Sequence, residues 1–202
     1  MPLLDHFHPP LHGPRRWEGF HHAWATFIAQ QLSQETLPPG YFAEPEIRVD
    51  FARLDSCEVR VYQDLGGAEL RGAIELVSPA NKDREGSRRT FAAKCADHLQ
   101  HGIGLIIVDI VTARTANLHE ELLENLEARG SVAAWASSTG LYAVAYRAVT
   151  VREAPHVEMW AEALTLGAAL PVLPLWLAVD LCVPVRLEEG YLATCRSLRI
   201  PA

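Results

Sequence analysis

Three residues near the middle of the chain carry side chains suited to metal or acid–base chemistry: Glu75, Lys82 and Lys94. Glu75 lies in the apolar segment Ala73 to Val77, which is typical of a β-strand. A carboxylate buried in a strand is costly unless a cation or a metal ion compensates its charge. Lys82 follows this strand directly, and Lys94 lies on a helix predicted for Arg88 to His101. A short loop joins strand and helix, so the carboxylate and an ammonium group could converge on one site, and we expect Lys94 to point at Glu75 across that loop.

Lysine is scarce in this chain, which makes the positions of Lys82 and Lys94 informative. They are its only two lysines among 18 basic residues. Lysine differs from arginine in being a compact point charge whose pKa burial can lower, a property that catalytic sites use. The alternative is an edge-strand Glu75 that faces solvent, with both lysines as ordinary surface charges.

Size and composition fit one soluble domain with a hydrophobic core. The chain has 202 residues, 49% of them hydrophobic, and a mean hydropathy of +0.02. No apolar run approaches the roughly 18 residues that a membrane span needs, and the first 16 residues lack the apolar core of a signal peptide. We therefore expect a cytoplasmic protein with no membrane partner. The four cysteines form no C-x-x-C pair and are expected to be buried small residues.

The net charge of −7 argues against a general nucleic-acid binder, whose footprint is usually basic. The one locally basic candidate is the segment Asp83 to Arg89, and its acidic residues dilute it.

Hydrophobic periodicity predicts an α/β domain with a mixed sheet flanked by helices. Residues 1–16 are expected to form an N-terminal arm on the surface, and residues 17–202 a single domain. A polar turn is expected at Asn81-Lys82. The predicted helices are 15–34, 88–101, 117–129 and 187–198, and the predicted strands are 41–54, 58–63, 70–77, 103–111, 141–151 and 157–164, with 171–179 strand-like or irregular.

The turn at Asp64 to Gly67 predicts a hairpin that brings the segment Asp55 to Glu58 opposite Glu75. The strand at 103–111 should lie parallel to the Glu75 strand, because a strand–helix–strand crossover returns the chain in the same direction. Asp109, the one charge in that strand, is expected to be structural, accepting hydrogen bonds or pairing with an arginine. His98 and His101 could share a ligand face on their helix, but capping of the helix end is favoured over zinc.

Several segments also resemble a known family. Trp17 to His21, Leu37 to Tyr41, Ile74 to Lys82 and Val108 to Ile110 are similar to an uncharacterised bacterial family, known as a domain of unknown function. The segment Ser78-Pro79-Ala80-Asn81-Lys82 is the most specific part. That family is in turn similar to the Uma-type proteins of the PD-(D/E)XK, or restriction-endonuclease-like, superfamily.

The resemblance implies a restriction-endonuclease-like fold, in which an acidic residue and a strand glutamate bind magnesium while a lysine assists an attacking water. Glu75 matches the strand glutamate, and Lys94 stands where the Uma-type pattern places the lysine, since Val77 occupies the usual lysine position. Asp55 is the best match for the other metal-binding carboxylate, although no proline precedes it. Lys82 is expected to contact phosphate.

Two functions follow. The first is a nuclease-like hydrolase that cleaves phosphodiester bonds of DNA with magnesium held by Asp55 and Glu75 and with Lys94 and Lys82 as catalytic residues. The second is a non-catalytic interaction module, with another protein as its partner, that keeps the fold and a degenerate metal site. The intact Glu75 and the two lysines favour the first, whereas the missing Pro-Asp motif and the acidic pI favour the second.

Overall fold

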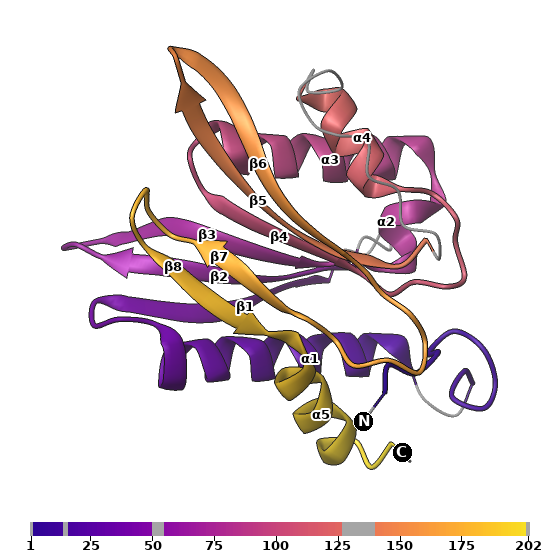
Figure 1. Cartoon of the computed structure of the whole chain (residues 1–202). Coiled ribbons are helices and arrows are strands. Elements are labelled where there is room, and N and C mark those ends of the chain that lie inside the picture. The colour runs from indigo at the N-terminus through magenta and orange to yellow at the C-terminus, as the bar shows by residue number, and fades with distance from the viewer. Residues whose placement is uncertain (1, 14–15, 50–54, 127–139, 201–202) are drawn as a thin grey trace.

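The computed structural model describes residues 2–13, 16–49, 55–126 and 140–200. These residues form one α/β domain with a six-stranded mixed sheet and helices on both faces (Figure 1). The helices are α1 (Trp17–Gln31), a π-helical turn η1 (Leu32–Thr36), α2 (Pro79–Asp83), α3 (Glu85–Gln100), α4 (Leu118–Asn125) and α5 (Leu187–Ser197). The strands are β1 (Tyr41–Val49), β2 (Asp55–Asp64), β3 (Ala68–Leu76), β4 (Gly104–Asp109), β5 (Tyr142–Val151), β6 (Ala154–Ala163), β7 (Val172–Trp176) and β8 (Cys182–Arg186).

The six strands of the main sheet lie side by side in sequence order, β1-β2-β3-β4-β5-β6. β3 pairs antiparallel with β2 and parallel with β4, as predicted. The other neighbours are antiparallel. A short turn joins β5 to β6, the connection from β4 to β5 contains α4, and α2 and α3 form the crossover between β3 and β4. The mixed α/β sheet predicted from hydrophobic periodicity is therefore confirmed.

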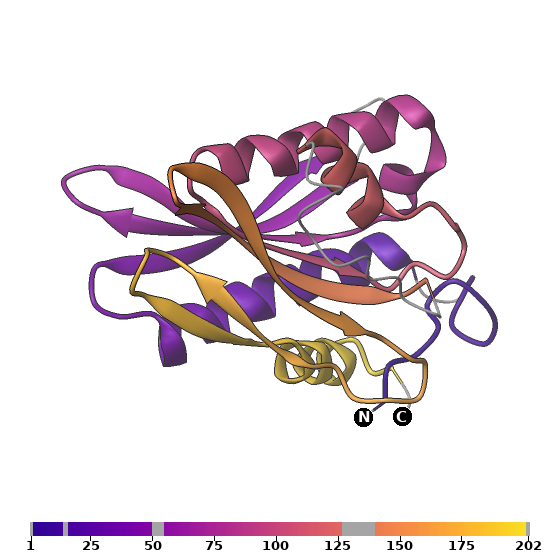
Figure 2. The same cartoon turned by 45° about the horizontal axis from the view of Figure 1, so that its top comes forward.

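Alternating side chains divide the core into two halves, one on each face of the sheet. On one face, Val59 and Ile74 pack with α1, α5, β7 and β8; on the other, Ala73 and Ile107 pack with α3 and α4. Figure 2 shows α1 and α3 on opposite sides of the strands. Residues of β2 and β3 that alternate with Val59 and Ile74 thus project toward α3.

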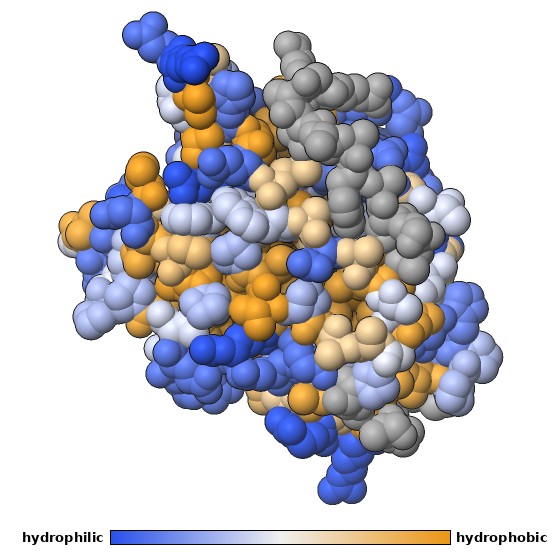
Figure 3. All heavy atoms as spheres, in the orientation of Figure 1, coloured by the Kyte–Doolittle hydropathy of each residue, from blue (hydrophilic) through white to orange (hydrophobic). Residues whose placement is uncertain are grey.

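The small β7–β8 sheet lies against the face that also carries α1 and α5. The prediction at 171–179 covers β7, whereas β8 was not predicted. β7 approaches β4 so closely that a Cβ atom added at Gly104 would lie 1.8 Å from the carbonyl oxygen of Trp176. Only glycine fits there. Hydrophobic atoms gather across the middle of this side of the molecule, and the tip of the β5–β6 hairpin is hydrophilic (Figure 3).

The N-terminal arm contributes to the core instead of lying only on the surface. Leu3, Phe7 and Leu11 are buried, and the backbone N–H of Leu3 donates to the carbonyl of Ala168 at 2.8 Å. The His6 ring contacts the Tyr191 hydroxyl on α5 at 2.8 Å. Apolar residues at 3, 7 and 11 explain the difference, because burying them is favourable.

One further element differs from prediction. The turn expected at Asn81-Lys82 is the short helix α2, since Pro79 occupies its first position and the Asn81 side chain accepts a hydrogen bond from the backbone N–H of Ser78 at 2.8 Å. The ends of two predicted elements, 50–54 and 127–129, lie outside the described residues. Within the described chain, the structure contains no helix with the length and apolarity required to cross a membrane.

Candidate functional site

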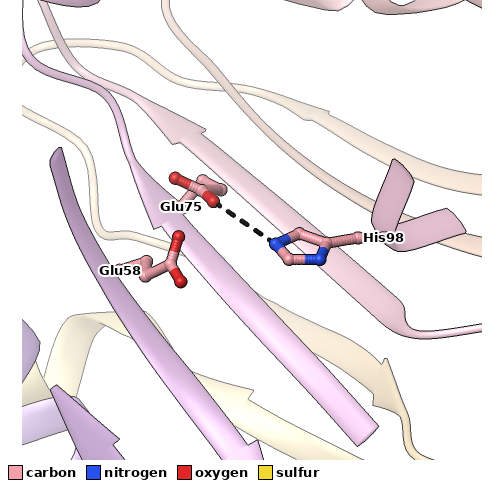
Figure 4. A group of neighbouring side chains, drawn as sticks. All are labelled: Glu58, Glu75 and His98. Atoms are coloured by element: carbon pink, nitrogen blue, oxygen red, sulfur yellow. Dashed lines mark ion pairs between the residues drawn. The ribbon is translucent and has the colours of Figure 1, made fainter. Parts of the chain in front are cut away.

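Two buried carboxylates, Glu58 and Glu75, lie directly opposite each other on β2 and β3 (Figure 4). Their residues are 2% and 1% exposed. A register shift between Val61 and Tyr62 produces this pairing. Without it, the register at the turn, Asp64 opposite Ala68, would place Cys57 opposite Glu75. The β-bulge therefore decides which β2 side chain faces Glu75.

The Lys94 side chain reaches this pair of carboxylates from α3. Its Nζ donates a hydrogen bond to Glu58 Oε2 at 2.8 Å and forms an ion pair with Glu75 Oε1 at 2.6 Å. Phe91, Cys95 and Leu99 are buried and hold this face of α3 against the sheet. The prediction that Lys94 points at Glu75 is confirmed. Its side chain keeps 30% of its surface exposed, so it connects the buried carboxylates with solvent.

Arg60 and Glu46 extend the cluster along the sheet. The Arg60 guanidinium forms ion pairs with both Glu58 and Glu46. The pKa of Arg60 is raised, because these acids and a hydrogen bond to Tyr62 outweigh its partial burial. Glu58 is thus held between two cations, Arg60 and Lys94.

The two carboxyl groups titrate as a pair, and their pKa values are displaced in opposite directions. Burial and the neighbouring Glu58 carboxylate raise the pKa of Glu75 to about 8, against the opposing effect of Lys94. Burial also acts on Glu58, but the hydrogen bond from Glu75 and the Lys94 and Arg60 charges lower its pKa to about 2. The surroundings therefore favour the ionised form of Glu58 and the protonated form of Glu75, and both acids raise the pKa of Lys94.

His98 lies one helical turn after Lys94 and completes the cluster. Its Nε2 is 4.0 Å from Glu75 Oε1, and the ring faces that carboxylate in Figure 4. One ligand atom from each of Glu58, Glu75 and His98 lies within 4.8 Å of the others, so these three residues could hold a metal ion. Capping of the helix end, expected for both histidines, is found for His101, whose Nδ1 contacts the Asp97 carbonyl at 2.8 Å.

Lys82 lies in a separate buried ion pair. Its Nζ donates to Asp109 Oδ2 at 2.7 Å, and the two side chains are 1% and 0% exposed. Among the described residues no ion pair joins Lys82 to Glu75. For Lys82 to contact phosphate as expected, this ion pair would have to open. Opening it would leave the buried Asp109 carboxylate unpaired, which is costly.

Asp109 accepts hydrogen bonds, which was one of the two predicted structural roles, and its ion-pair partner is Lys82 instead of an arginine. Its other oxygen accepts from the backbone N–H of Val111 at 3.0 Å. Burial raises the pKa of Asp109 to about 6, against the opposing effect of the Lys82 charge.

Asp55, the predicted second metal ligand, begins β2 opposite Val49. It lies three residues before Glu58, roughly 10 Å along the strand, and its side chain lies outside the described residues. The described carboxylate that faces Glu75 belongs to Glu58. The hairpin prediction brought the segment ending at Glu58 opposite Glu75, but the sequence did not single out Glu58.

The cluster reaches the surface at Lys94, Arg60 and Glu46, whose side chains are 30%, 21% and 26% exposed. An open cavity of about 1080 Å³ lies between the C-terminal end of α3 and the β5–β6 hairpin, and its lining includes Gln100, Arg147 and His156 but none of the cluster residues. In its described conformation the cluster holds a cation over two acids; the ammonium group would have to rotate outward for a metal ion to replace it. The Lys94 side chain is partly exposed, and its four-carbon stem has the freedom that such a change needs.

Comparisons with protein-family models, with curated proteins and with solved structures gave no match. The family resemblance drawn from the sequence therefore stays a prediction.

Proposed function

We propose that this chain is a restriction-endonuclease-like domain that hydrolyses phosphodiester bonds in DNA with a divalent metal ion. One observation carries the proposal: Lys94 lies 2.6 Å from Glu75 and 2.8 Å from Glu58. A strand glutamate, a second carboxylate and a helix lysine are the groups that the family resemblance implies. The mixed sheet with helices on both faces is compatible with that family's fold.

The donor set fits a divalent cation, because two carboxylate oxygens from adjacent strands already share one positive charge. Glu58 takes the place predicted for Asp55, and Glu75 keeps its predicted role. Magnesium, the ion that the resemblance implies, would polarise the phosphodiester and acidify a bound water.

The chain's own groups supply positioning and charge. β2 and β3 fix the two carboxylates, since both side chains project from paired strands. Lys94, once released from the acids, would donate a hydrogen bond to the attacking water or to a non-bridging phosphate oxygen. Arg60 stays on Glu58 and maintains that carboxylate in its ionised form.

Cleavage assays with single- and double-stranded DNA in magnesium or manganese test this function. We expect cleavage by the wild-type protein, loss of cleavage in chelator, and no cleavage by Lys94→Ala or Glu75→Gln. Matched controls are Arg196→Ala on α5 and Glu69→Gln on β3, two exposed residues outside the cluster. Both controls should cleave like wild type.

The second candidate function is a non-catalytic interaction module, and the burial of the cluster favours it. Lys94 and Arg60 already neutralise acids that are 2% and 3% exposed at their side chains, and such a network can serve to specify the fold. In that case the wild-type protein cleaves no DNA under any metal condition, and Lys94→Ala changes only the melting temperature.

A further inference from the structure

His98 has a buried ring without the hydrogen bonds that buried imidazoles normally make. The side chain is 7% exposed, and among the described residues neither Nδ1 nor Nε2 has a hydrogen-bond partner. Leaving a buried polar atom without a hydrogen bond is costly, so such atoms usually have a role or a ligand. The ring does not point into an apolar part of the core: its Nε2 is directed at Glu75 (Figure 4).

The atom that His98 faces is also incompletely satisfied. Glu75 Oε1 is buried and has no contact of hydrogen-bond geometry among the described residues, although the Lys94 ammonium lies 2.6 Å away. Two independent buried groups, an imidazole nitrogen and a carboxylate oxygen, therefore face the same small volume. Glu58 borders that volume from β2, with one of its oxygens within 4.8 Å of the other two ligand atoms.

We infer that Glu58, Glu75 and His98 form a binding site for a first-row transition-metal dication, with Lys94 moving outward when the ion binds. Metal–ligand bonds of about 2.0 to 2.2 Å bring ligand atoms within roughly 4 Å of each other, so the described spacing needs only a small contraction. The ammonium group of Lys94 lies where a cation is attracted by both acids.

The donor set selects the class of metal. Imidazole nitrogen suits zinc, iron, nickel and copper, and carboxylate oxygen suits manganese as well. Magnesium prefers an all-oxygen octahedron with several waters, and a histidine adds little to its binding. Three protein ligands also leave an open position, as in catalytic zinc sites. This inference rests on the proposed function in one respect, that Glu58 and Glu75 exchange the Lys94 ammonium for a metal ion.

Direct binding of Co²⁺ and Zn²⁺ to the purified full chain, followed by calorimetry and by the visible absorption of Co²⁺, tests the site. We expect one tight ion per chain in the wild-type protein. His98→Gln should weaken that binding at least about tenfold, since even the loss of an outer-shell partner of a ligand costs 10- to 100-fold. The matched control is His101→Gln, three residues further along α3 and 68% exposed at its side chain, which should bind like wild type.

A measurement on the wild-type protein covers the case in which His98→Gln fails to fold. In the Co²⁺-loaded chain, proton NMR should show strongly shifted imidazole resonances from a single histidine. Their absence, or equal affinity in wild type and a folded His98→Gln, overturns the inference.

The two proposals can fail separately. Magnesium-dependent cleavage that His98→Gln leaves unchanged, together with no Co²⁺ bound by His98, would retain the hydrolase and remove the transition-metal site. Tight Co²⁺ binding through His98 without cleavage in any metal would do the reverse.

Discussion

Glu58 and Glu75 are cross-strand partners whose buried carboxyl groups face the same helix, α3. Two like charges in this position repel each other unless a proton or a cation lies between them. Here both are present, since Glu75 has a pKa raised to about 8 by burial and by Glu58, and Lys94 contacts both groups. The stability of the sheet at this point therefore depends on charges that a ligand could alter.

Replacing Lys94 by methionine should remove the charge while keeping most of the side-chain volume. We expect the free energy of unfolding at pH 7 to fall by about 1 to 3 kcal/mol, because Glu58 loses a hydrogen-bonded cation. Adding Glu58→Gln to Lys94→Met should recover part of that loss, since contacting residues are not additive. Urea denaturation of the two single variants and the double variant measures the coupling. If Lys94→Met and the exposed control Arg89→Met lowered the free energy of unfolding equally, Lys94 would not be the stabilising counter-charge of Glu58.

Asp109→Asn should be more damaging than Lys94→Met. It leaves the Lys82 ammonium, 1% exposed at its side chain, without its counter-charge, and breaking one half of a buried ion pair typically costs about 3 to 5 kcal/mol. The double variant Lys82→Met with Asp109→Asn should regain much of this stability. Chemical denaturation checks both, and Co²⁺ affinity should be unchanged in any of these variants that fold. A loss of Co²⁺ affinity would place Lys82 and Asp109 in the metal site.

Acidification should destabilise the protein through His21. Its ring is buried on α1, with Nε2–H donating to the Leu76 carbonyl at 2.7 Å, and burial lowers its pKa to about 4 from 6.5. Between these values the unfolded chain binds more protons than the folded one, so stability is present above pH 6.5 and is lost as the pH falls toward 4. Through His21, the free energy of unfolding at pH 5 is lower by about 2 kcal/mol than well above pH 6.5. His6, with a pKa also lowered to about 4 by burial, acts in the same direction.

Histidine titration by NMR checks this directly: the His21 ring should stay neutral at pH 5. Urea denaturation at pH 7 and pH 5 should show a smaller difference for His21→Gln than for wild type. A His21 pKa near 6.5 in the folded protein would be incompatible with the prediction.

Gly104→Ala should displace β7 from the sheet. The new Cβ atom would lie 1.8 Å from a backbone oxygen of Trp176, which no side-chain rotation can relieve. We expect a loss of more than about 3 kcal/mol. Gly86→Ala on α3 is the matched control, because the space around it is open, and alanine there should be neutral or stabilising by roughly 0.5 to 1 kcal/mol. Thermal denaturation compares the two, and similar melting temperatures would show that β7 can shift freely.

The sequence by itself determined most of the helices and strands, although not α2 or β8, and the relative directions of β2, β3 and β4. The alternation around Val59 and Ile74 specifies half-buried strands, and the apolar run of β4 specifies a strand covered on both faces. It also identified Glu75 and Lys94, because a carboxylate in an apolar strand and a rare lysine on the next helix are local signals. These signals depend only on residue types and on neighbours close in the chain, and both can be read from the sequence.

Only the tertiary structure decided which groups meet. A one-residue bulge places Glu58 opposite Glu75 where the turn register alone would place Cys57, and no sequence pattern announces that shift. Lys82 turns to Asp109 because α2 ends beside β4, a contact between residues 27 positions apart. His98 shares a helix face with Lys94 by its spacing of four, so the sequence contained that signal. Whether this face covers the two acids depends on how α3 crosses the sheet. The burial of Phe91, Cys95 and Leu99 fixes that orientation, and this burial is a property of the packed core.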